Sequence, residues 1–222
     1  MYRIGDVIFC SNDAKNVAIG LAKASLYNEV SAQKNKSKCI GSFITSSKMP
    51  RTYGLLVIFA LVTTSSYAQA RYPWAEKQHF EWKDFTGFPD AESPYAASVN
   101  TGLSQDFSID HDGKLVLDSL QITAYFYPKL SWYKPKQVNA DLLKHERLHF
   151  TITELHARML RKQIARFNFT TNLRSEIRQM YQEIEQKRQK MQIDFDAQTQ
   201  HGLRAEQELL WEEKVNLLLA KY

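Results

Sequence analysis

The segment LLKHERLH, residues 142–149, contains an HExxH motif made by His145, Glu146 and His149. Residues four apart lie about one turn apart on the same face of a helix, so the motif predicts a helix that points two imidazoles at one ion. If that ion is zinc, each ring nitrogen lies about 2.0–2.1 Å from it. Glu146 lies beside the same face, where it can take a proton from metal-bound water. The motif therefore predicts a metallohydrolase in which Glu146 is the general base.

A catalytic zinc site also needs a third protein ligand and leaves a fourth position for water. His156 shares the helix face, but it lies seven residues after His149. On an unbroken helix this separation is roughly 10 Å, too far for both rings to bind one ion. The best candidate is His201, which lies in DAQTQHG, residues 196–202, where helical periodicity fails. Gly202 follows it and lets the backbone approach closely. The alternative is that His201 is a surface residue in a loop that caps a helix.

Several other polar residues have candidate roles around the predicted ion. Asp196 or Thr199 can orient the ring of the third histidine by accepting its other N–H. Glu154 projects from another side of the motif helix, which indicates a supporting or surface carboxylate rather than a ligand. Glu176 and Glu183, on the following helix, are alternative third ligands.

An apolar run, LLVIFALV at residues 55–62, follows basic residues and precedes a segment that ends in AQA at Ala70. This pattern is typical of a secretory signal peptide, here residues 49–70, with cleavage after Ala70. Spanning a bilayer takes about 20 apolar residues, so no membrane span is expected after cleavage; an uncleaved anchor is the alternative. Because a signal peptide begins a chain, we interpret residues 1–48 as a misassigned leader and Met49 as the start of translation.

The positive charge of the chain lies in this leader. Residues 1–70 hold eight Lys or Arg and three Asp or Glu, so the net charge of +5 leaves residues 71–222 neutral, with 21 charges of each sign. Nucleic-acid binding is therefore not expected. Cys10 and Cys39 also lie in the leader, so the remaining domain has no disulfide and depends on its core or on a metal for stability. Without Cys or a GxSxG elbow, a Ser- or Cys-nucleophile enzyme is not expected.

Residues 71–222 are long enough for one domain, and their pattern predicts an α+β, zincin-like fold. The N-terminal half predicts a small antiparallel β region, with a short strand and turn at residues 80–89 and a hairpin that reverses at Asp110–Gly113. The C-terminal half predicts three helices, the first carrying HExxH. The first helix is expected from Ala140 to about Phe167. The second is expected from a cap at Thr171 or Asn172 up to a break at Asp194–Gly202. The third is expected from Leu203 to Leu219, and its inward-facing residues are Leu203, Leu210, Trp211, Val215 and Leu218.

Four segments occur in a fixed order along the chain: WKDFTGFP at 82–89, AASVNTG at 96–102, HERLHFTITELHAR at 145–158 and DAQTQHG at 196–202. Together they resemble a bacterial family known as domain of unknown function 922. Members of that family are exported and are described as zinc-dependent proteases. The resemblance covers most of residues 74–219 and implies that His145 and His149 bind zinc, that Glu146 is catalytic and that His201 is the third ligand.

Two positions depart from the pattern of that family. Phe195 stands where Tyr is expected, so a hydroxyl that assists the transition state would be missing, and Thr151 stands where Asp is common. The expected function is that of a secreted or periplasmic zinc peptidase, in which a strand beside the motif helix holds an extended peptide or protein substrate by main-chain hydrogen bonds. The alternatives are metal-assisted hydrolysis of a non-peptide bond and a non-catalytic exported binding or envelope-associated protein with a structural metal or none.

Overall fold

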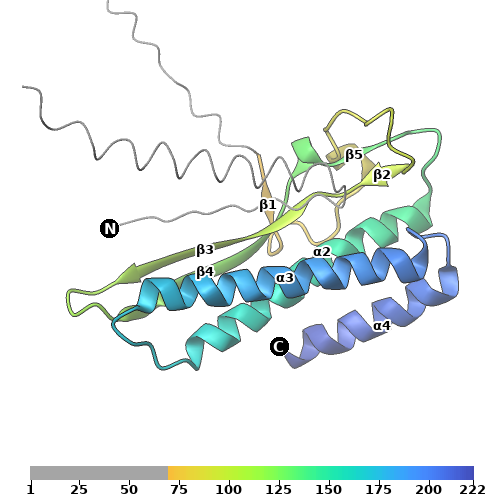
Figure 1. Ribbon diagram of the computed structural model, residues 1–222. Helices are drawn as coiled ribbons and strands as arrows, with labels where there is room; N and C mark the ends of the chain where they lie inside the picture. The colour runs from red at the N-terminus through yellow and green to blue at the C-terminus, as the bar shows by residue number, and fades with distance from the viewer. Residues whose placement is uncertain (1–69) are drawn as a thin grey trace, which may run out of the picture. The chain divides into compact units, whose positions relative to one another are not determined.

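The computed structural model describes residues 70–222, in which antiparallel strands precede three α-helices (Figure 1). The α+β class and the small antiparallel sheet are therefore confirmed. The predicted leader, residues 1–48, and the signal peptide, residues 49–70, lie outside the described residues except for Ala70. Within residues 70–222, no helix is long and apolar enough to cross a membrane.

The strands form two separate antiparallel sheets. One has the order β1–β4–β3, and the other pairs β2 with β5. The strands are β1 (Tyr72–Pro73), β2 (Ala97–Ser98), β3 (Thr101–Ile109), β4 (Leu115–Phe126) and β5 (Trp132–Tyr133); the 3₁₀ helices are η1 (Trp82–Asp84) and η2 (Pro128–Leu130); the α-helices are α2 (Ala140–Ala165), α3 (Leu173–Thr199) and α4 (Ala205–Lys221).

The predicted hairpin is confirmed, because β3 and β4 pair along most of their length and reverse at Asp110–Gly113. The side chain of Asp110 stabilises the turn, its Oδ1 accepting hydrogen bonds from the backbone N–H of Asp112 at 3.0 Å and of Lys114 at 2.8 Å. Gly113 adopts a φ of 81°, a left-handed conformation that glycine reaches without steric cost. The turn residues thus fix the register locally.

The prediction of a strand within residues 80–89 was wrong, because the segment folds into η1. Its aromatic rings explain the difference. Phe80 stacks on Phe126 with ring centroids 4.5 Å apart, and Phe85 packs edge-on against Phe80 at 5.3 Å. Side chains five residues apart point to opposite faces of an extended strand, so the chain must coil for both rings to enter the same core.

Helix α2 begins where the sequence predicts. Asn139 Oδ1 accepts a hydrogen bond from Leu142 N at 2.8 Å, which satisfies one of the free N–H groups at the helix start. Two apolar clusters surround the helix. Phe150, Ala157, Leu160 and Ile164 join the core under the β3–β4 sheet, whereas Leu148 and Ile152 pack with Phe195, Trp211 and Val215 from α3 and α4. Helix α2 is therefore covered by the sheet and by both other helices.

Helix α3 continues through the segment where a break was expected, and it ends at Thr199. Thr199 Oγ1 donates to the carbonyl of Phe195 at 2.7 Å, so its side chain bonds to a carbonyl of the last helical turn. The ring of Phe195 is fully buried, and its burial supplies the packing that polar neighbours lack. Asp196 is consequently a helical residue with a fixed direction.

Helix α4 turns back along α2 after a short connection (Figure 1). Trp211 and Val215, four residues apart, form its buried face, as predicted. Leu203 and Leu210 were expected to face inward but are exposed, at 82% and 53%. Leu203 lies before the helix begins, and Leu210 lies about 100° around the helix from Trp211. Two buried side chains thus define how α4 docks.

Candidate metal centre

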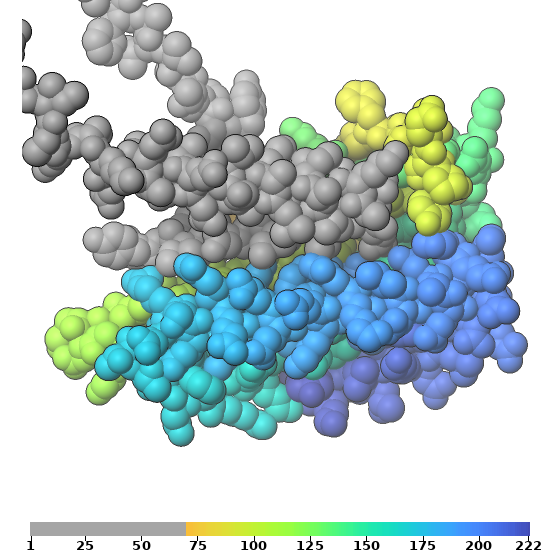
Figure 2. Space-filling model, viewed as in Figure 1, coloured from red at the N-terminus to blue at the C-terminus, as the bar shows by residue number. Residues whose placement is uncertain are grey.

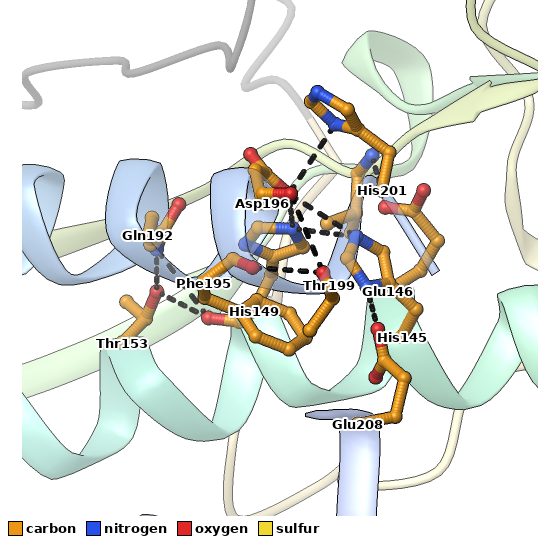
Figure 3. Close-up of polar contacts among 11 residues, drawn as sticks. His145, Glu146, His149, Thr153, Gln192, Phe195, Asp196, Thr199, His201 and Glu208 are labelled. Atoms are coloured by element: carbon orange, nitrogen blue, oxygen red, sulfur yellow. Dashed lines mark hydrogen bonds and ion pairs between the residues drawn. The ribbon is translucent and has the colours of Figure 1, made fainter. Parts of the chain in front are cut away.

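Two imidazoles and one carboxylate meet between α2 and α3 (Figure 3). His145 Nε2 lies 3.1 Å from Asp196 Oδ1, and His149 Nε2 lies 2.9 Å from the same oxygen. The two Nε2 atoms are 3.3 Å apart. The HExxH spacing therefore does place both rings on one side of α2, and the unexpected last turn of α3 places the carboxylate opposite them.

These three atoms fit a divalent metal ion. A tetrahedral ion with bonds of about 2.0–2.1 Å holds its ligand atoms about 3.3 Å apart, and the observed separations of 2.9, 3.1 and 3.3 Å are close to that value. Two imidazoles and one carboxylate also form a donor set that suits zinc and leaves a position open. The group of His145, His149 and Asp196 can thus bind a metal ion.

The charges of His145, His149 and Asp196 influence one another strongly, because the three side chains are close together and buried. The side chains of His145 and His149 are 2% and 1% exposed, and that of Asp196 is 10% exposed. Burial lowers the pKa of His145, but its hydrogen bonds with Asp196 and Glu208 outweigh this effect and raise the pKa to about 9. Burial raises the pKa of Asp196, but the two neighbouring imidazoles hold it well below its usual range. The carboxylate is therefore ionised and ready to coordinate a cation.

Glu208, from the first turn of α4, contacts the other ring nitrogen of His145. Its Oε1 lies 2.7 Å from His145 Nδ1. A carboxylate in this position accepts a hydrogen bond from Nδ1–H, so that the neutral ring has its lone pair on Nε2, as is common for histidines that bind metals. The sequence does not single out Glu208, because an acidic side chain in the first turn of a helix is already favoured by the helix dipole.

Glu146 points from α2 toward Val99, the residue that directly follows β2. Its Oε2 accepts a hydrogen bond from Val99 N at 2.9 Å. The side chain is buried, and burial raises the pKa of its carboxyl despite the opposing effect of the two nearby histidines. A carboxylate with a raised pKa beside a metal-binding group has the properties required of a general base.

A cavity of about 360 Å³ lies beside these residues and is lined by His145, Glu146, His149 and Asp196. Part of its wall comes from the loop before β2 and from β2 itself, through Tyr95, Ala97 and Ser98. Figure 2 shows that loop, in yellow, on the surface beside the end of α3, in blue. The group of three donors is thus buried on the protein side and accessible from the cavity.

His201 lies at the edge of this cavity, outside the group of three donors. Its Nδ1 is 3.5 Å from Asp196 Oδ1, and its side chain is 42% exposed. The ring packs against Tyr95, with centroids 4.3 Å apart. Asp196, expected to support a third ligand, instead stands with the two imidazoles, and the ligand role of His201 stays a prediction.

The remaining candidates make their hydrogen bonds to other groups. Thr199 bonds to the carbonyl of Phe195 and not to a histidine ring. Glu154 Oε1 accepts hydrogen bonds from Arg158 at 3.0 Å and Arg161 at 2.9 Å. Glu176 is partly exposed and Glu183 is exposed, and these alternative ligands accept hydrogen bonds from Thr170 and Gln179, respectively.

A buried polar network supports the helix turn that carries His149. The carbonyl of His149 accepts hydrogen bonds from Thr153 Oγ1 at 3.0 Å and from Gln192 Nε2 at 3.4 Å. Behind these residues, Arg188 pairs with Glu185 through two hydrogen bonds, its side chain being fully buried. Helices α2 and α3 are thus held in register next to the candidate metal centre.

The family described as "Bacterial protein of unknown function (DUF922)" matches residues 105–202. The resemblance expected from the sequence is confirmed. The matched region contains the HExxH motif, Asp196 and His201, and it ends at Gly202. No curated protein and no solved structure matches the chain. The comparisons therefore support a family resemblance, and the chemistry of the site is inferred from its own residues.

Proposed function

We propose that residues 71–222 form an exported zinc-dependent peptidase. The observation that carries the proposal is the meeting of His145, His149 and Asp196 in a buried group, with Glu146 beside it and a cavity in front of it. A structural metal needs no adjacent cavity and no buried carboxylate with a raised pKa. The predicted signal peptide at residues 49–70 supports export.

The chain divides the chemistry between its own groups and the ion. His145, His149 and Asp196 hold the ion, and a zinc ion held this way acts as a Lewis acid toward a carbonyl group and toward water. Glu146 takes the proton from the attacking water and delivers it to the leaving amine. Val99 N–H holds one of its carboxylate oxygens in place, which leaves the other oxygen available for the proton.

The substrate is an extended peptide that lies along β2. This strand pairs with β5 through one edge, and both its residues, Ala97 and Ser98, line the cavity. Val99, the next residue, sends its N–H to Glu146. A peptide added to the other edge of β2 would therefore run past the general base and gain main-chain hydrogen bonds of the kind seen in β-augmentation.

Metal analysis of the full chain tests the proposal. We expect the parent to bind about one zinc ion and to cleave peptides, and we expect His145→Ala and Asp196→Ala to lose most of the metal because each removes one of three ligands. His111→Ala, at an exposed hairpin turn, serves as the control. Glu146→Gln should keep the metal and lose hydrolysis. Turnover retained in Glu146→Gln would rule out this general base, and a parent without zinc would rule out the whole assignment.

A further inference from the structure

We infer that His201 donates a hydrogen bond to the carbonyl oxygen of the scissile bond as that oxygen becomes negatively charged. The inference rests on the proposed function, since it assigns a role at the same site. It replaces the ligand role predicted for His201 with a catalytic one. Three observations carry it: the exposure of the ring, the way its backbone is held, and its position relative to Glu146.

Exposure separates His201 from the residues that can hold the ion. The side chains of His145 and His149 are almost fully buried, at 2% and 1% exposure, whereas that of His201 is 42% exposed. Its Nδ1 is 3.5 Å from Asp196 Oδ1, too far for a good hydrogen bond, and it falls outside the group of three donors. His201 therefore stands between that group and the solvent, where a substrate enters.

The backbone holds His201 in this place at a conformational cost. Gln200 and His201 have φ values of 53° and 54°, and Gly202 follows at 84°. Left-handed non-glycine residues are uncommon, and they persist where surrounding contacts fix them. Here His201 N donates to Asp196 O at 3.0 Å, and Arg204 N donates to Thr199 O at 2.9 Å. The end of α3 thus fixes the backbone of His201 next to Asp196.

Glu146 and His201 both line the cavity, together with the three metal-binding residues. A peptide carbonyl placed among them has a proton acceptor in Glu146 and a donor in His201, whose neutral imidazole always carries one N–H. A donor aimed at the developing oxyanion typically accelerates acyl transfer by about 10²–10³. Phe195 supplies no such donor, because its side chain has no N–H or O–H group; its ring packs against His145 with centroids 4.5 Å apart.

The test compares His201→Ala and His201→Gln with the exposed-histidine control His111→Ala, each in the full chain. Zinc affinity is measured by competition with a chromogenic chelator. The affinity for a peptide phosphonate, whose tetrahedral anion mimics the charged oxygen, is measured by calorimetry on the zinc-loaded proteins. A second measurement gives kcat and KM for a peptide substrate.

We expect His201→Ala to keep its zinc affinity within about threefold, to bind the phosphonate about 10²-fold more weakly, and to lose about 10²–10³ in kcat with little change in KM. His201→Gln, which restores an N–H donor, should recover part of both losses. Loss of zinc from His201→Ala would overturn the inference in favour of a ligand role. Unchanged phosphonate affinity would also overturn it.

The phosphonate measurement separates failure of the inference from failure of the proposed function. A parent that binds zinc and phosphonate but cleaves no peptide would contradict the peptidase assignment, while the phosphonate affinities would still decide the donor role of His201. A parent that binds zinc without binding the phosphonate would contradict the donor role. A parent that binds no zinc would contradict both proposals.

Discussion

Removing the charge of Glu208 tests how far the last helix controls the candidate metal centre. Glu208 Oε1 is 2.7 Å from His145 Nδ1, so Glu208→Gln keeps the shape of the side chain but weakens its hold on the Nδ1 proton. Partners of this kind typically contribute 10–100-fold to metal affinity, or about 1.4–2.8 kcal/mol. Because the Glu208 side chain is 19% exposed, solvent screens part of its charge, and we expect a loss near tenfold. Glu208→Ala should approach the upper limit.

Zinc affinity can be measured by competition with a chromogenic chelator at fixed pH. Glu206→Gln is the matched control, because Glu206 is exposed and lies in the same first turn of α4, where it makes the same kind of contribution to the helix dipole. Its zinc affinity should stay within about twofold of the parent. The reasoning fails if Glu208→Gln and Glu206→Gln bind zinc equally well.

Three further predictions concern stability, each measured by urea unfolding of the metal-free protein. Burial lowers the pKa of His156 to about 4. Its contribution to the free energy of unfolding is therefore fully present above pH 6.5 and is lost as the pH falls toward 4, by up to about 3 kcal/mol. His156→Gln should flatten this pH dependence of stability, and an unchanged slope would contradict the assignment. Gly202→Ala should cost about 1–2 kcal/mol through its left-handed φ of 84°, and Gly113→Ala, with a φ of 81° and open space around it, should cost a similar amount; unchanged stability in either variant would contradict this reasoning. Arg188→Leu should cost about 3–5 kcal/mol, because it leaves the carboxylate of Glu185 buried without the opposite charge of Arg188. Replacing both residues by Leu should cost less. Equal costs for the single and double variants would contradict a stabilising pairing of the two charges.

The parts of the fold that depend on neighbouring residues could be predicted from the sequence. Asn139 caps the motif helix through a contact three residues away, and Asp110 fixes the hairpin turn through contacts two and four residues away. The end of α3 could not be predicted in the same way. Its polar residues resemble a loop, and only the burial of Phe195 against α2 and α4 keeps the segment helical.

The candidate site follows the same division. The spacing of His145 and His149 places both imidazoles together because one helix contains them. Asp196 and Glu208 reach the same rings from 47 to 63 residues further along the chain, and this convergence depends on how three helices dock. The neighbouring Gly202 made His201 a candidate site residue in the sequence, but the position of His201 depends on where α3 ends.

The attachment of α4 to the rest of the protein has a consequence for handling the protein. Only Trp211 and Val215 of this 17-residue helix are buried, so its docking depends on a few polar contacts, among them those of Glu208 with His145, Trp211 with Gln198 and the Leu219 carbonyl with Arg158. An ion that fixes the ring of His145 would also secure the carboxyl-terminal segment. Chelators are therefore expected to loosen that segment before the sheet, and amide exchange or limited proteolysis near the C-terminus would report the metal content of a preparation.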